Sequence, residues 1–176
     1  MVGRAAAAPA AVRQLLEGLP DWFGEPSAIE EYVADAARMP NYFARAGEDV
    51  IGVLLLRRHF AESAEIQLIA VDRAWHRRGV GRALVTAVQA DLTSTAGSAT
   101  QLLQVKTIGP SLDDPFYAET RKFYLSLSFL PLEELLGAQS PTTPWPCLVL
   151  VKPLSTHTRP FDGQPPENQP VEPPAT

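Results

Sequence analysis

The chain of 176 residues is poor in cysteine and contains no long apolar run. Cys147 is its only cysteine, so no intramolecular disulfide and no cysteine-based metal cluster can form, which fits a reducing compartment. The longest strongly apolar run, residues 50–56, is far shorter than the roughly 20 residues that cross a bilayer. The alanine-rich start includes an acidic residue and is typical of a short helix rather than a signal peptide. We therefore expect a cytoplasmic protein with no membrane partner.

The sequence also lacks an excess of positive charge. Its formal net charge is −5, and binding to nucleic acids depends on a spread basic surface, so we expect no nucleic-acid partner. Most of its 15 cationic residues are arginines, which suit recognition of a phosphate group. No ligand spacing surrounds His59 or His157, so these histidines are expected on the surface and no metal site is predicted.

Two common phosphate-binding motifs are absent. The dinucleotide pattern G-x-G-x-x-G fails because Leu84 stands at the third glycine position. The Walker pattern fails because no G-K-[S/T] occurs, which weakens the hypothesis of phosphoryl transfer.

Hydrophobic periodicity predicts an alternation of helices and strands. Ser27 and Glu30 form a candidate capping box before the second helix. An antiparallel pair is expected around Gly47, and the strand–helix–strand order over residues 65–108 predicts parallel neighbours, so the sheet should be mixed. The predicted helices cover residues 10–19, 27–38, 79–95 and the later part of 113–127, and the predicted strands lie within 42–59 and at 65–71, 102–108, 129–136 and 147–153.

The strand at residues 65–71 should alternate between two faces. Ile66, Leu68 and Ala70 are expected on one face, with Glu65, Gln67, Ile69 and Val71 on the other. The whole pattern predicts one domain over residues 10–154. Residues 1–9 are expected to be a flexible N-terminus, and the proline-rich residues 155–176 a disordered tail.

Residues 76–82 join an apolar run to a helical pattern. The first amides of a helix lack internal acceptors and carry partial positive charge, so an anion is favoured there. Two glycines would let the main chain approach such an anion closely. The alternative is a tight turn with solvated arginines. The candidate anion-binding residues are His76, Arg77, Arg78, Gly79, Val80, Gly81 and Arg82.

The segment "HRRGVG" resembles the [Q/R]-x-x-G-x-[G/A] signature of the GNAT superfamily of N-acetyltransferases, although His76 replaces the usual Gln or Arg. The order of elements over residues 10–154 is also similar to this family. The segment "RKFYLSLSFLPLEE" resembles its F-Y-x-x-x-G-F segment, with Ser128 in place of glycine. The resemblance implies an α/β (α+β) GNAT fold, with a mixed central sheet whose parallel strands splay apart, flanked by helices.

The resemblance also implies acetyl transfer from acetyl-CoA to a primary amine by direct attack. The turn that contains Gly79 and Gly81, residues 76–82, is called the glycine turn and would hold the coenzyme A pyrophosphate. The backbone of Ile69, Ala70 and Val71 would pair with the pantetheine. By position, Glu65 is the candidate general base, and half-burial could raise its pKa. Tyr124 is the candidate acid near the sulfur, and Tyr117 is a weaker one.

Several alternatives stay open. Glu65 could be a solvated acid, and Tyr124 could simply pack its helix on the sheet. The chain could also be a non-catalytic acyl-CoA sensor or scaffold of the same fold. Trp22, Phe23 and Trp145 could line an acceptor pocket or pack the core. The acceptor, a small-molecule or peptide amine, is not determined by the sequence, and neither is homodimer formation.

Overall fold

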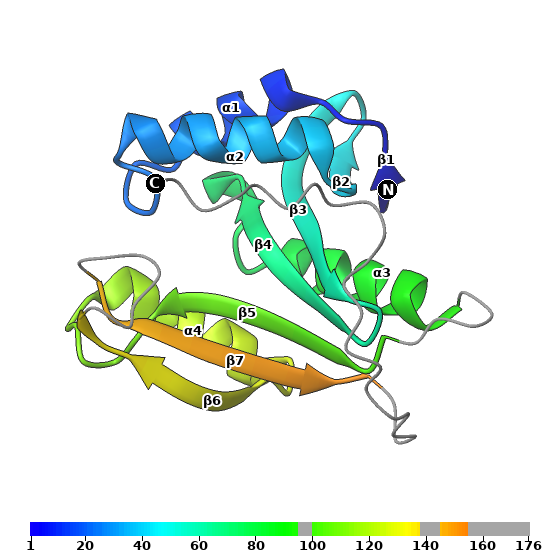
Figure 1. Ribbon diagram of the computed structural model, residues 1–176. Helices are drawn as coiled ribbons and strands as arrows, with labels where there is room; N and C mark the ends of the chain where they lie inside the picture. The colour runs from blue at the N-terminus through cyan, green and yellow to red at the C-terminus, as the bar shows by residue number, and fades with distance from the viewer. Residues whose placement is uncertain (95–99, 138–144, 155–176) are drawn as a thin grey trace, which may run out of the picture.

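The computed structural model describes residues 1–94, 100–137 and 145–154. Within these ranges the chain forms a mixed sheet with helices on both faces (Figure 1). The strands are β1 (Val2–Ala5), β2 (Asn41–Ala46), β3 (Asp49–Phe60), β4 (Ser63–Val71), β5 (Leu102–Ile108), β6 (Leu130–Leu135) and β7 (Cys147–Pro153). The helices are α1 (Pro9–Glu17), α2 (Pro26–Arg38), α3 (Val80–Ser94), α4 (Pro115–Ser126) and the short 3₁₀ helix η1 (Arg73–Trp75). The predicted mixed α/β architecture is confirmed.

The sheet has the order β1-β2-β3-β4-β5-β7-β6. Among the strands that the structure describes, only the β4–β5 pair is parallel, as the strand–helix–strand pattern predicted, and α3 is the crossover between them. Helices α1 and α2 cover one face, where Val12, Leu15 and Leu16 pack against Val53 and Leu55 of β3. Helices α3 and α4 cover the opposite face (Figure 1). The sheet therefore separates two cores.

The N-terminus differs from the sequence-based expectation. Residues 1–9 were predicted to be flexible, but Val2–Ala5 form β1, which pairs antiparallel with residues 41–44 of β2. The Met1 amino group also donates to the carbonyl of Arg45 at 2.9 Å. A four-residue strand carries too little periodicity to be recognised, and its pairing depends on an edge that a distant segment provides.

The start of α2 differs as well. Helix α2 begins at Pro26, so Ser27 lies inside the first turn and the predicted capping box with Glu30 does not form. Proline is favoured at this position because its φ suits a helix and its missing N–H is not needed. Glu30 instead accepts two hydrogen bonds from Arg13 of α1, at 2.5 and 2.7 Å.

Candidate functional site

Strands β4 and β5 pair over only part of their length. Residues 63–66 of β4 pair with residues 102–105 of β5, whereas β4 continues to Val71 and there, within residues 1–94, 100–137 and 145–154, pairs only with β3. The two strands visibly diverge beyond this point (Figure 1). The edge of β4 that contains Ile69 and Ala70 therefore has no β5 partner. An extended ligand can pair with such an edge as another strand would.

A β-bulge at Gln67 lies at the start of this separation. The β3–β4 ladder pairs Leu55 with Leu68 but Leu56 with Ile66, so Gln67 is an extra residue. One inserted residue reverses the alternation of side chains. The expectation that Ile66, Leu68 and Ala70 share a face is therefore wrong: Ile66 packs on the α3 side, and the other two on the α1–α2 side.

The side chain of Gln67 connects the bulge to α2. Its amide donates to Asp35 at 3.2 Å, and Arg57 of β3 donates to the same carboxylate oxygen at 3.3 Å. Arg38 donates to the other oxygen at 3.2 Å. Asp35 is only 6% exposed, and these donors compensate its buried charge. The bulge is thereby fixed to the helix layer above it.

The turn between β4 and α3 presents a run of free amides. None of the backbone N–H groups of residues 77–82 donates to another part of the described chain, whereas Ala83 donates to the Gly79 carbonyl. Arg77 and Gly79 have positive φ values of 59° and 82°. Alternating left-handed residues at a helix start can direct successive amides into one concavity that suits an anion.

The side chains of this turn have separate contacts. The His76 ring donates from Nε2 to the Val71 carbonyl at 2.8 Å, so the residue that departs from the family signature ties the turn to the end of β4. The Arg78 guanidinium lies 5.2 Å from the Trp75 ring centroid. Arg82 is within 3.4 Å of both oxygens of Ser126 on α4. Arg77 is largely exposed and 3.8 Å from Glu119.

Gly81 has a packing function in addition to its place in the turn. A Cβ atom there would lie 3.0 and 3.1 Å from ring atoms of Phe123 on α4. The absence of a side chain lets α3 and α4 approach closely at this point. Gly79 has open space around it, but its positive φ favours glycine.

Glu65 lies where the two parallel strands are still paired, opposite Gln104. Its Oε2 atom accepts three hydrogen bonds: from Gln104 and Lys106 of β5, at 3.0 Å each, and from His59 of β3 at 2.5 Å. Oε1 accepts no hydrogen bond within the described part of the chain. Glu65 is only 4% exposed, so these donors determine its charge state.

The pKa of Glu65 is shifted in the direction opposite to the sequence-based expectation. Burial alone would raise this pKa, but the hydrogen bonds from His59 and Lys106, the charge of Lys106 and the hydrogen bond from Gln104 together lower it to about 2. Half-burial was expected to raise it, and that interpretation is wrong. The reason is that neighbouring strands place two cationic or ionisable donors on one carboxylate oxygen.

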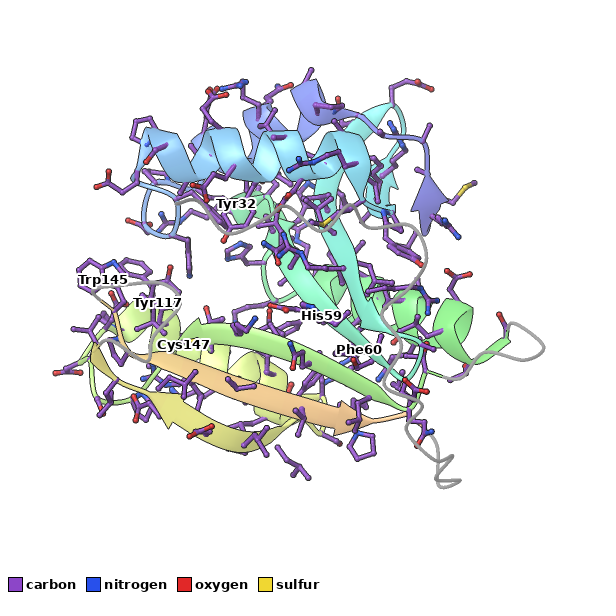
Figure 2. All side chains as sticks on the ribbon, viewed as in Figure 1. Tyr32, His59, Phe60, Tyr117, Trp145 and Cys147 are labelled. Carbon is purple, nitrogen blue, oxygen red and sulfur yellow. The ribbon has the colours of Figure 1, made fainter. Side chains whose placement is uncertain are left out.

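His59 is a partner of Glu65 rather than an isolated surface histidine. The ladder pairs Arg58 with Ala64 and Phe60 with Ser63, so His59 is the extra residue of a second bulge. A bulge can redirect a side chain, and here the ring contacts Glu65 while keeping 30% of its side chain exposed. In Figure 2, His59 lies near β5 and Tyr32 extends from α2 toward the sheet. Sequence reasoning missed this contact because both bulges depend on strand pairing.

Tyr124 is almost completely buried on α4, in edge contact with Phe129. Burial, and then the neighbouring Tyr32, raises the pKa of Tyr124, so its phenol stays protonated at neutral pH. Tyr32 of α2 also raises the pKa of Tyr117, after burial. Tyr32 is thus electrostatically close to both candidate acids, and its own pKa is raised by burial and, among other charges, by Glu65. The sequence offered no signal for Tyr32.

Several aromatic side chains pack together beside the glycine turn. The Trp22 ring contacts His76 and Phe116, with centroids 5.7 and 5.1 Å apart, and the Tyr117 hydroxyl donates to the Trp22 carbonyl at 3.4 Å. Phe23 packs instead against Tyr32. Asp114 is the N-cap of α4, and its side chain accepts from the amides of Phe116 and Tyr117. Trp145 is half exposed near the start of β7 (Figure 2).

The structure also bears on the single cysteine, on metal binding and on membrane-spanning helices. Cys147 is buried. The described part of the chain contains no group of His, Cys, Asp and Glu that could hold a metal ion. Its helices are all too short or too polar to cross a membrane. His157 and the predicted tail lie outside the described residues.

Comparison with solved structures places this arrangement among the GNAT folds. A GNAT-family protein from Desulfovibrio desulfuricans has a TM-score of 0.71, 22% identity, and coverage of 88% of this chain and 99% of that one. The ribosomal-protein-S18-alanine N-acetyltransferase of Escherichia coli has a TM-score of 0.68 and 17% identity, and the match covers 92% of this chain and 99% of that one. A GNAT acetyltransferase from Elizabethkingia anophelis, solved with acetyl-CoA bound, has a TM-score of 0.64 and 17% identity, and the match covers 87% of this chain and 97% of that one.

A sequence comparison identifies the family directly. The model of the acetyltransferase (GNAT) domain matches residues 39–129, more than half of the chain. The match includes the β4–β5 pair, the glycine turn and Tyr124. The chain therefore belongs to the GNAT acetyltransferase family. No curated protein matches it at a significant level.

Proposed function

We propose that this protein transfers an acetyl group from acetyl-CoA to a primary amine by direct attack, without a covalent enzyme intermediate. The observation that carries the proposal is the separation of β4 and β5 beyond Ile66, directly before a turn whose amides have no acceptor in the described chain. The acetyl-CoA bound to the Elizabethkingia relative supports the same co-substrate here.

Each part of the coenzyme has a candidate binding segment. The pyrophosphate lies against the amides of residues 77–82, where the helix start and the nearby arginines favour negative charge. The pantetheine pairs with the free edge of β4 at Ile69, Ala70 and Val71. The Val71 carbonyl already accepts from His76, so Ile69 and Ala70 offer the freer backbone groups on this edge.

The reaction then needs one proton acceptor and one proton donor. The neutral amine attacks the thioester carbon, a C–N bond forms, and the C–S bond breaks with its electron pair on sulfur. Glu65 accepts the proton of the attacking nitrogen at Oε1, directly or through a water molecule, and later releases it to solvent. Tyr124 donates its hydroxyl proton toward the leaving thiolate and regains one from solvent.

Tyr124→Phe tests this assignment, because it keeps the ring and its packing while removing the hydroxyl. We expect turnover to fall on the order of 10- to 1000-fold, with acetyl-CoA affinity within a few-fold. Calorimetry measures the affinity, and free thiol release with a panel of amines measures turnover. Tyr117→Phe is the matched control, which should turn over more nearly as the parent does.

The outcomes separate the hypotheses. Acetyl-CoA binding without turnover in the parent chain would identify a sensor or scaffold. A slow Tyr117→Phe with a normal Tyr124→Phe would move the acid role to Tyr117. Failure of the parent chain to bind acetyl-CoA would refute the proposed function.

A further inference from the structure

The loop between α1 and α2, residues 18–25, reaches both sides of the separation between β4 and β5. Its Trp22 ring packs edge-to-face with His76, which follows β4, with the ring centroids 5.7 Å apart. The same ring packs edge-to-face with Phe116 at the start of α4, which follows β5, with the centroids 5.1 Å apart. The loop lies at the same end of the sheet as the start of α4 (Figure 1). Trp22 therefore links two elements that follow diverging strands.

Hydrogen bonds hold this loop in place on both sides. Asp21 accepts from Arg73 of η1 at 2.6 Å, which attaches the loop to the segment after β4. The Trp22 carbonyl accepts from the Tyr117 hydroxyl of α4 at 3.4 Å, a longer and weaker bond. The Trp22 amide donates to the Leu19 carbonyl at 3.1 Å. The position of the Trp22 ring is thus fixed by its own backbone as well as by its neighbours.

The two ring partners of Trp22 are each connected to one of the diverging strands. The His76 ring donates from Nε2 to the carbonyl of Val71, the last residue of β4, at 2.8 Å. On the other side, Arg121 of α4 donates to the carbonyl of Ile108, the last residue of β5, at 3.0 Å. Each ring contact of Trp22 therefore acts close to the end of one strand.

We propose that Trp22 is a positioning residue for the coenzyme: its ring contacts with His76 and Phe116 set the width of the separation between β4 and β5 in which the pantetheine arm of acetyl-CoA lies. This inference rests on the proposed function and adds a residue to it. A fixed width holds the pantetheine against the free edge of β4. It also keeps the thioester at a constant distance from Glu65, which lies where the two strands are still paired.

The expected magnitude follows from the two ring contacts. An edge-to-face aromatic pair contributes a factor of about 2–10 to an equilibrium constant beyond the area that it buries. Loss of both contacts should therefore weaken acetyl-CoA binding on the order of 10-fold. The nucleotide 3′-phosphoadenosine 5′-diphosphate has the pyrophosphate of the coenzyme but no pantetheine, so its affinity should stay within about two-fold. Comparison of the two ligands separates an effect on the pantetheine from a general loosening of the site.

Trp22→Leu tests the proposal in the full chain, with Trp22→Phe as the conservative variant. Calorimetry measures the Kd of both ligands, thiol release measures KM and kcat, and circular dichroism checks folding. For Trp22→Leu, the Kd and KM of acetyl-CoA should rise on the order of 10-fold, and kcat should fall by less. Trp22→Phe should restore most of the affinity, because a phenyl ring can keep the edge contacts.

The adjacent residue of the same loop supplies a matched control. Phe23 is also aromatic, but it packs against Tyr32 of α2, with the centroids 5.8 Å apart. Phe23→Leu should therefore lower the melting temperature while leaving the Kd of acetyl-CoA within about two-fold.

His76→Gln supplies a second variant, because glutamine can still donate to the Val71 carbonyl but has no ring to contact Trp22. This variant loses one of the two contacts and should weaken acetyl-CoA binding about 3-fold, with the pantetheine-free nucleotide unaffected. In the Trp22→Leu background, His76→Gln should have no further effect on acetyl-CoA affinity, since the contact is already lost. If Trp22→Leu does not fold, His76→Gln alone provides the same comparison of ligands.

Equal losses for the two ligands, an unchanged acetyl-CoA affinity in a folded Trp22→Leu or in His76→Gln, or the same loss in Phe23→Leu would each overturn the inference and leave Trp22 as core packing. Strict additivity of Trp22→Leu and His76→Gln would also overturn it. Failure of the parent chain to bind acetyl-CoA would instead refute the proposed function.

Discussion

Glu65→Gln should cost much of the folding stability at neutral pH and far less in acid. Glutamine has nearly the same shape and can still accept a hydrogen bond, but it lacks the negative charge that His59 and Lys106 hold. The pKa of Glu65 is lowered from 4.5 to about 2 in the folded protein. Since one pKa unit corresponds to about 1.4 kcal/mol, the charged carboxylate contributes about 3 kcal/mol at pH 7.

The sign of the pH dependence follows from the direction of this pKa change. A lowered folded-state pKa means that the contribution is complete above pH 4.5 and is lost as the pH falls toward 2. By pH 3 about 2 kcal/mol of it has gone. For a chain of this length, 3 kcal/mol corresponds to a decrease in melting temperature of about 6–12 °C at pH 7.

Thermal unfolding of the parent chain and of Glu65→Gln, followed by circular dichroism at pH 7, 5, 4 and 3, measures the difference. Glu133→Gln, at an exposed position on β6, is the control and should match the parent throughout. The reasoning is refuted if Glu65→Gln differs from the parent by the same amount at pH 7 and pH 3. That result would mean that the donors on Oε2 do not stabilise the charged form.

Three glycine-related substitutions test the turns around the site by chemical denaturation. Gly79→Ala should cost about 1–2 kcal/mol through its positive φ alone, whatever residue stands at position 123. Gly81→Ala should destabilise the folded protein, because the added Cβ contacts the Phe123 ring. In a double-mutant cycle, Phe123→Leu should relieve part of that cost. Strictly additive changes in the free energy of unfolding would contradict the contact. Ser128→Gly should stabilise by about 0.5–1 kcal/mol, because Ser128 has a φ of 64° at the end of α4, and an unchanged midpoint would show that serine is not strained there.

The order of helices and strands could be predicted because it depends on local patterns. Alternation marks strands such as β4 and β5, and the 3.6-residue period marks α3 with its buried Leu84 and Val88. The glycine turn was recognisable for the same reason: Gly79 needs no distant partner to adopt a positive φ. Likewise, Ser128 was identified as standing where the family has glycine, and the backbone takes the left-handed conformation there.

The environment of Glu65 could not be predicted, because residues from three strands create it. A bulge redirects His59, β5 supplies Gln104 and Lys106 at the register opposite Glu65, and the Gln67 bulge reverses the faces of the rest of β4. Each of these three features depends on which backbone groups pair across the sheet. A single inserted residue changes that pairing without leaving a pattern in the sequence. The sequence by itself determined that a carboxylate stands before a glycine turn in a GNAT fold. Only the tertiary structure decided that this carboxylate is held ionised by its neighbours, since its charge state depends on donors that folding brings within hydrogen-bond distance.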